Sequence, residues 1–203
     1  MKAVMKSVTP QICGKVASGN CTMLVSKTVP KGGTPFKGYI YCTSSDVHSA
    51  LVVGDGDAKL IHCCNYKSAI PVGGAIGNGK VIGEFVCDEV EKFSVGSLRC
   101  DDIEKLACLS YREMINYFYK PEELDGKTSK MGYGWHISDL KIYDKPKELS
   151  EFFTIDESDN DCCIACVYHE TPIEEMPCRT CTGERKYLYR PPQSWQYVEE
   201  LEE

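Results

Sequence analysis

The 203-residue chain lacks several features that mark special classes of protein. No uninterrupted apolar run approaches the ~20 residues that a helix needs to span a bilayer, which argues against an integral membrane protein. No apolar segment follows the charged residues 1–6, so the sequence predicts no secretory signal peptide. Internal repeats and low-complexity stretches are absent too. With 42% hydrophobic residues, the chain is expected to be a cytoplasmic globular protein.

Thirteen cysteines stand out against this background. Disulfides are rare in reducing compartments, so a cysteine-rich cytoplasmic chain more often binds a metal ion or buries its thiols. Cys13, Cys42, Cys87 and Cys108 lie within apolar helix or strand patterns. We expect these four to be inert core residues, because an unmodified cysteine packs like a small hydrophobic side chain.

The last quarter of the chain carries a metal-binding pattern. Cys163 and Cys166 form one C-x2-C pair, and Cys178 and Cys181 form a second pair eleven residues later. Two such pairs allow four thiolates to converge on one zinc ion in a tetrahedron. With four protein ligands the ion has no open position, so the pattern predicts a structural zinc that stabilises a segment too small for its own core.

The ligands and the metal stay open at this point. Cys162 is an alternative to Cys163, and His169 could replace one thiolate. The same four cysteines also fit an iron–sulfur cluster, or four free thiols in a surface loop.

The net charge of −7 is unevenly distributed. Residues 1–50 hold six lysines and one aspartate, whereas residues 151–203 hold thirteen acidic and four basic residues. The basic region is suited to contact phosphate, and the acidic region would repel it. An acidic chain argues against a protein that coats duplex DNA, which normally presents a basic face throughout. Two solvated surfaces are the simpler interpretation of the same charges.

Strand and helix patterns alternate along the chain. Thr9, Pro10 and Gly19 mark the start and end of a short helix. Capping-box pairs at Asp101/Glu104 and Ser110/Glu113 predict two more helices. Strands are expected at residues 3–8, 22–27, 36–43, 80–87 and 133–143. This mixture predicts an α+β fold or a small barrel with helices at its ends. We divide the chain into a barrel domain at 1–150 and, at 151–203, an acidic linker, the four-cysteine metal-binding segment and a tail.

Several motifs spread over nearly the whole chain form a specific combination. They are Ser18-Gly19-x-x-Thr22, Thr34-Pro35-Phe36-Lys37-x-Tyr39-Ile40-Tyr41-Cys42-Thr43, Gly79 to Cys87, Tyr133-Gly134-Trp135-His136-Ile137-Ser138-Asp139-Leu140, Tyr143 to Leu149, and Arg190-Pro191-Pro192-Gln193-Ser194-Trp195. In these motifs the chain resembles the ASCH domain, a PUA-like β-barrel family, and most of all its phage and prophage branch from Gram-positive bacteria.

The resemblance implies a small barrel with a groove that binds RNA or nucleotides, and some relatives hydrolyse RNA or deacylate a modified nucleoside. The family signature, Gly-x-Lys-Thr-x-Glu-x-Arg, falls on residues 19–26. Gly19 and Thr22 match it, but Cys21, Leu24 and Ser26 stand where the family has lysine, glutamate and arginine. These three side chains cannot reproduce the charges that hold phosphate or move protons. We therefore expect the family's chemistry to be weak or lost.

Some polar side chains remain as candidates. Thr22, Glu84 and Cys21 are the candidates for catalysis, with His136 as a possible base for the Cys21 thiol. Hydroxyl, cation and stacking contacts to a ligand are expected from Thr22, Ser26, Lys27, Lys31, Tyr41, Glu84, Trp135 and His136. Four of them also have a structural interpretation: Cys21 and Trp135 as core residues, His136 as an ordinary strand histidine, and Glu84 as half of an ion pair.

Three functions follow from these observations. We favour a binding module for RNA, a nucleotide or a modified nucleoside. The second is an active ribonuclease or nucleoside amidohydrolase that depends on Glu84 or Thr22. The third is a phage protein that blocks a host defence such as CRISPR, with its acidic tail covering a basic nucleic-acid channel. Fold alone does not choose among them, because function depends on the site.

Overall fold

The structure is a computed structural model that describes residues 2–44, 49–62, 70, 73–95, 101–123, 129–154 and 187–201. Two short 3-10 turns lie at Pro121–Glu123 and Leu149–Glu151. The helices are α1 (Pro10–Ala17), α2 (Asp101–Leu106) and α3 (Tyr111–Phe118). The strands are β1 (Lys2–Val8), β2 (Met23–Ser26), β3 (Phe36–Cys42), β4 (Ser49–Gly54), β5 (Asp57–His62), β6 (Ala75–Ile76), β7 (Val81–Cys87), β8 (Val90–Val95), β9 (Lys130–His136), β10 (Ser138–Lys147) and β11 (Trp195–Glu199).

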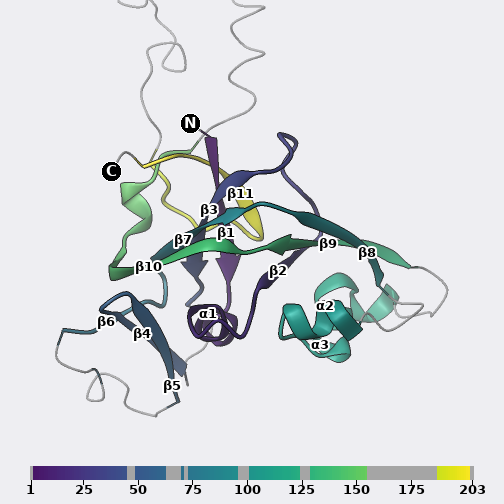
Figure 1. Cartoon of the computed structure of the whole chain (residues 1–203), viewed down its shortest axis with the longest axis horizontal. Helices are drawn as coiled ribbons and strands as arrows, with labels where there is room; N and C mark the ends of the chain where they lie inside the picture. Colours follow the sequence, from purple (N-terminus) through teal and green to yellow (C-terminus); the bar gives the residue numbers. More distant parts are fainter. Residues whose placement is uncertain are drawn as a thin grey trace, which may run out of the picture.

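A five-stranded sheet in the order β10-β7-β3-β1-β11 forms the centre of the molecule (Figure 1). β1 is parallel to β3, and the other neighbouring strands are antiparallel. The first and last strands of the described chain therefore lie side by side. β1 and β3 are buried along most of their length, in agreement with their apolar and aromatic sequences.

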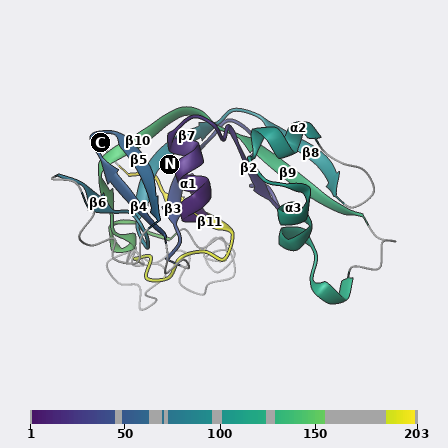
Figure 2. The same ribbon diagram turned by 90° about the horizontal axis from the view of Figure 1, so that it is seen from below.

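Two smaller sheets extend from this centre in opposite directions. β2, β9 and β8 form one sheet, and α2 and α3 pack beside it. β5, β4 and β6 form the other, which contacts α1. Figure 2 shows α1 between the two ends of the molecule. The α+β class predicted from the sequence is confirmed.

The expected barrel, however, is not closed among the described residues. β10 and β11 are opposite edges of the central sheet, and no described strand joins them. The expected single strand at 133–143 is in fact two strands, since β9 ends at His136 and β10 begins at Ser138. Asp139, with a φ of 46°, lies just inside β10. β9 then pairs with β2 and β8, while β10 pairs with β7. This switch between sheets leaves an open assembly in place of a barrel.

The local helix signals behave as their chemistry predicts. Pro10 occupies the first turn of α1, and Gly19 has a φ of 73° just beyond its end. Thr9 precedes the helix, but its side chain makes no cap hydrogen bond. The capping box is confirmed at Ser110, whose hydroxyl accepts from the amide of Glu113 while the Glu113 carboxylate accepts from the amide of Ser110.

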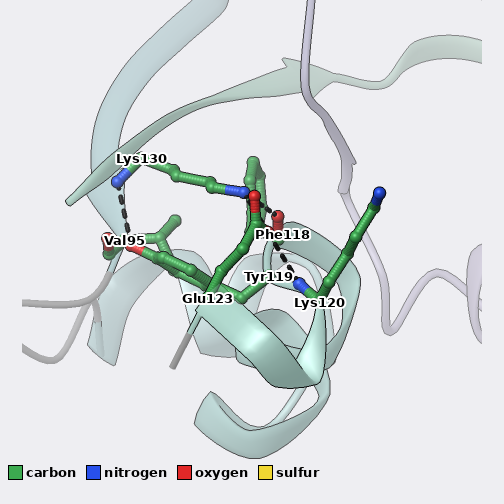
Figure 3. A network of polar contacts seen from close by, with 6 residues as sticks. All are labelled: Val95, Phe118, Tyr119, Lys120, Glu123 and Lys130. Atoms are coloured by element: carbon green, nitrogen blue, oxygen red, sulfur yellow. Dashed lines mark hydrogen bonds and ion pairs between the residues drawn. The ribbon is translucent and has the colours of Figure 1, made fainter. Parts of the chain in front are cut away.

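A polar network fastens the end of α3 to β8 and β9 (Figure 3). The Tyr119 hydroxyl donates to the carbonyl of Val95 at 2.5 Å and accepts from the amide of Lys130 at 2.9 Å. The Lys130 ammonium donates to Phe118 O at 3.1 Å and forms an ion pair with Glu123. These contacts fix the position of α3, which forms one wall of a cavity described below.

The four cysteines of the predicted zinc site, together with Cys162 and His169, lie outside the described residues. The boundary at residue 150 stays a prediction. Residues 195–199, which we placed in the second region, nevertheless pair with β1 in the central sheet. None of the helices in the described ranges is long and apolar enough to cross a membrane.

Candidate functional site

The larger of two hollows on the central sheet is a groove of about 600 Å³, here called the lysine groove. It lies between the loop after β2 and the strands β1, β3 and β11. Its walls combine three lysines, two aromatic rings, two glycines and one carboxylate: Lys2, Lys31, Lys37, Phe36, Tyr197, Gly32, Gly33 and Glu200, with Val4, Pro30, Pro35 and Val86. The volume is in the range of small-molecule binding sites.

Contacts with β11 hold the wall of the lysine groove in place. The Tyr197 hydroxyl accepts a hydrogen bond from the amide of Lys31 at 2.8 Å, and the Lys2 ammonium lies 5.1 Å from the centre of the Tyr197 ring. The Tyr197 ring also packs edge-on against Trp195 at 5.3 Å. Tyr197 therefore presents a ring that is held by Trp195 and by the backbone of Lys31, with the Lys2 ammonium over it and with Lys31 in the lining of the same groove.

Lys37 has a different role in the lysine groove. Its ammonium lies 3.4 Å from Glu84 and 3.6 Å from Glu200. Tyr143 donates to the same Glu84 carboxylate at 2.8 Å. Glu84 thus lies in a half-buried network that joins β3, β7 and β10, as the structural interpretation of this residue predicted. With three lysines against Glu200, the lining of the groove is basic.

The second hollow, here called the Lys6 cavity, is smaller, at about 160 Å³. It lies where the central sheet meets the helical end of the molecule. β1, β2, α3, the start of α1 and the segment before β11 all contribute to its walls. They are mainly apolar and include one buried lysine: Lys6, Ser7, Val8, Thr9, Ile12, Met23, Leu24, Val25, Ala107, Leu109, Glu113, Tyr117, Gln193 and Ser194.

Lys6 is only 3% exposed, which is unusual for a lysine. Its ammonium donates to Ser194 Oγ at 3.1 Å and lies 5.1 Å from the centre of the Trp135 ring. The amide of Ser7 donates to the carbonyl of Ser194 at 2.9 Å, which fixes this serine beside β1. Burial lowers the pKa of Lys6 to about 7 because the charged form loses its hydration.

The signature segment forms part of the same cavity but supplies no charge to it. Leu24 and Ser26 project from the same face of β2, and Trp135 lies directly opposite Leu24 on β9. Ser26 is fully buried, and no hydrogen-bond partner for its hydroxyl is found among the described residues. At the two positions where the signature that the sequence resembles has a glutamate and an arginine, this chain has Leu24 and Ser26, and Lys6 of β1 lines the same cavity as Leu24.

Cys21 is unsuited to nucleophilic attack. Its thiol is buried and lies 3.3 Å from the carbonyl oxygen of Met23 and 3.5 Å from that of Ala107. Burial raises the pKa of Cys21 to about 11, so the thiol stays protonated at neutral pH. His136, its proposed base, pairs instead with Asp88, whose Oδ1 lies 2.7 Å from Nδ1.

The remaining predicted ligand contacts are scattered. Trp135 is fully buried and Tyr41 is 4% exposed, so both are core side chains in this structure. Thr22 joins β2 to its neighbours, because its amide donates to Leu106 and its carbonyl accepts from Ile137, both at 2.9 Å. Lys27 lies with its ammonium 5.2 Å from the centre of the Tyr117 ring.

Most of the groups that line the two hollows were not predicted from the sequence. Lys31 was the only lysine of the lysine groove among the candidates, and Lys6 was not among them. The motif ending at Trp195 was the available signal, since it continues into β11, which carries Tyr197 and forms one wall of the groove. No cluster of three metal-binding side chains occurs within the part of the chain that the structure describes.

The chain matches no protein-family model and no curated protein. Among solved structures it is similar to the ASCH protein of Zymomonas mobilis. A tyrosine-to-phenylalanine mutant of that protein superimposes with a TM-score of 0.52 and 14% identity over 98% of this chain and 92% of the other. The ASCH structure without the mutation gives 0.50 and 14% over 98% and 88%.

The chain has an ASCH-like fold. At 14% identity, this likeness describes the arrangement of the chain and not its ligand. Within the ASCH-like fold, the signature segment forms one wall of the Lys6 cavity, and the lysine groove lies at the other end of β1.

Proposed function

We propose that this ASCH-like protein is a binding module for single-stranded RNA or a nucleotide, and that the lysine groove is its binding surface. The observation that carries the proposal is a groove whose lining combines Lys2 and Lys31 with the Tyr197 ring. Single-stranded RNA is recognised by just these two elements, cations for phosphate and aromatic faces for bases.

Binding is favoured over catalysis for two reasons. The signature positions 21, 24 and 26 hold side chains without the family's charges, and the Cys21 thiol is protonated at neutral pH. Glu84 is already bonded to Tyr143 and Lys37. A phage origin and a host defence partner stay predictions from the sequence resemblance, and no surface of the described residues specifies such a partner.

Charge reversal in the lysine groove is expected to weaken RNA binding. Lys31→Glu and Lys2→Glu should each raise the Kd for a labelled single-stranded oligonucleotide by about tenfold, which corresponds to ~1.4 kcal/mol. Each change should also reduce the salt slope of log K by about 1, as expected when one phosphate contact is lost. Fluorescence anisotropy at several salt concentrations measures both quantities, and a panel of mononucleotides tests the smaller ligands.

Lys59→Glu is the matched control, because this lysine is highly exposed on β5 and lies outside the lysine groove. It makes the same change in net charge. Equal losses in Lys59→Glu and Lys31→Glu would show that the affinity comes from overall charge. Absence of binding by the wild-type chain at millimolar nucleotide and low salt would refute the proposal.

We also propose that Cys163, Cys166, Cys178 and Cys181 bind one structural zinc ion, on the basis of their spacing alone. Metal analysis of the purified protein is then expected to give about one zinc per chain. Changing Cys178 and Cys181 to serine should abolish this zinc, whereas Cys108→Ser should leave it unchanged. A metal-free protein with four titratable thiols in this segment, or an iron-loaded one, would contradict the zinc assignment.

A further inference from the structure

The Lys6 cavity is separate from the lysine groove, and the two share no lining residue. None of its groups has a role in the proposed RNA binding. It nevertheless contains an amine, that of Lys6, which is the kind of group that the ASCH signature has at the position of Cys21. A buried amine can act as a nucleophile when its surroundings leave it uncharged.

The surroundings of Lys6 favour an uncharged, nucleophilic amine. No carboxylate of the described residues forms an ion pair with it. Glu113 also lines the cavity, but its carboxylate accepts hydrogen bonds from the amide and hydroxyl of Ser110 at 2.8 and 2.6 Å. These bonds hold the pKa of Glu113 below its usual value, which keeps the carboxylate committed to its helix cap.

The hydroxyl groups of Ser194 and Tyr117 form a series of polar contacts that begins at the Lys6 amine. Ser194 Oγ lies 3.1 Å from Lys6 Nζ, and the Tyr117 hydroxyl lies 3.4 Å from Ser194 Oγ. A chain of amine, serine and tyrosine of this kind can pass protons to and from a reacting oxygen. The walls are mainly apolar and include Val8, Ile12 and Leu24, which disfavours charged ligands.

We propose that the Lys6 cavity is a reactive-amine site that takes a short, uncharged aldehyde or ketone and holds it as an imine on Lys6. The amine nitrogen adds to the carbonyl carbon to give a carbinolamine. A C=N bond then forms, the C–O bond breaks, and the oxygen leaves as water with two protons that come from the amine by way of Ser194 and Tyr117. The step needs no oxidant or reductant. The cavity has room for roughly five water volumes, which limits the ligand to a small molecule.

The chemistry gives a quantitative expectation for reactivity. With the pKa of Lys6 at about 7, half of its amine is neutral at pH 7, whereas an ordinary exposed lysine is neutral in roughly one molecule in 3000. Even if restricted access costs a large part of this advantage, Lys6 is expected to react at least about tenfold faster than an exposed lysine.

The test uses butanal and cyanoborohydride at pH 7 on the full-length protein, with the site of reductive alkylation located by peptide mass spectrometry. Lys6 is expected to be modified at least about tenfold faster than Lys59, the internal comparator. Its rate should rise to a plateau above pH 8, while that of Lys59 should continue to rise to pH 9. Modification of Lys6 at or below the rate of Lys59 would overturn the proposal.

Two controls separate a built site from general amine reactivity. Ser194→Ala should slow the reaction of Lys6 and leave that of Lys59 unchanged, because it removes the hydroxyl next to the amine. A bulky aldehyde such as naphthaldehyde should lose the preference for Lys6, since it exceeds the cavity. A preference that persists with the bulky aldehyde, or is unaffected by Ser194→Ala in a folded variant, would contradict the assignment of the cavity as the site.

Discussion

Replacing Lys6 by methionine is expected to stabilise the folded protein at pH 7 by roughly 1–4 kcal/mol, on the scale observed when buried ion pairs are replaced by hydrophobic residues of similar volume. Lys6 is 3% exposed, and burial lowers its pKa from 10.5 to about 7. In the folded protein at pH 7, some of the Lys6 amines are therefore deprotonated, and the others keep their charge without hydration. Both states cost free energy. Methionine has a similar length and no charge, so it removes this penalty.

The same residue predicts how stability depends on pH. Between about pH 7 and 10.5 the unfolded chain binds the Lys6 proton more tightly than the folded chain does. The free energy of unfolding should therefore rise with pH across this window, by up to ~1.4 kcal/mol per pH unit from this group, and its contribution should be flat below pH 7. Buried thiols and tyrosines with raised pKa values act in the opposite direction at the alkaline end, so pH 7 to 9 is the most informative range.

Urea unfolding of the wild type and of Lys6→Met at pH 6, 7, 8 and 9 measures both effects. The gap between the two proteins should be largest at pH 6 to 7 and should narrow toward pH 9. Lys59→Met is the matched control and should change stability by no more than about 0.5 kcal/mol, as is usual for exposed sites. A gap that does not depend on pH would show that Lys6 keeps its proton in the folded state.

Trp135→Ala is expected to destabilise the protein by ~3–5 kcal/mol, the usual cost of removing a large aromatic side chain from a core. Trp135 is fully buried and packs edge-on against Phe36 at 5.3 Å and Trp195 at 5.9 Å, while its ring also faces the Lys6 amine. Because it joins β9 to β3 and β11, its loss affects all three strands. For a chain of this length the midpoint of thermal unfolding should fall by roughly 6–20 °C.

Trp135→Phe keeps an aromatic ring and should lose much less stability. This pair of variants also tests the role that the sequence predicted for Trp135, a stacking contact with a ligand. If Trp135→Ala keeps the wild-type unfolding temperature but no longer binds RNA, then Trp135 is a ligand contact and its place in the core is wrong.

The sequence predicts the local structure of this chain better than its long-range contacts. The start of α1 at Pro10, the end signal at Gly19 and the capping box of Ser110 depend on neighbouring residues and appear as expected. The pairing of β11 with β1 joins residues almost 200 positions apart, and no local pattern encodes it. The prediction of a barrel failed for a related reason: the chain changes sheets between His136 and Ser138, and the strand pattern at 133–143 does not reveal that β9 and β10 pair with different partners.

The prediction of functional residues shows the same difference between local signals and long-range contacts. Lys31 was predicted as a cation that could contact a nucleotide, because it lies in the segment of the sequence that resembles the ASCH domain. Lys6 was missed because a lysine in a strand is normally assigned to the solvent face. Its burial results from Trp135 and Ser194, which are distant in sequence.

The position of β1 has a consequence for the order in which the protein is made. β1 is synthesised before the other described strands, whereas its neighbour β11 is synthesised after them. Until β11 has been made, the nascent chain therefore exposes one edge of a strand that is buried in the folded protein, and such an edge can pair with a neighbouring chain. The central sheet is completed only when residues 194–199 supply β11 and, with it, Ser194 beside Lys6.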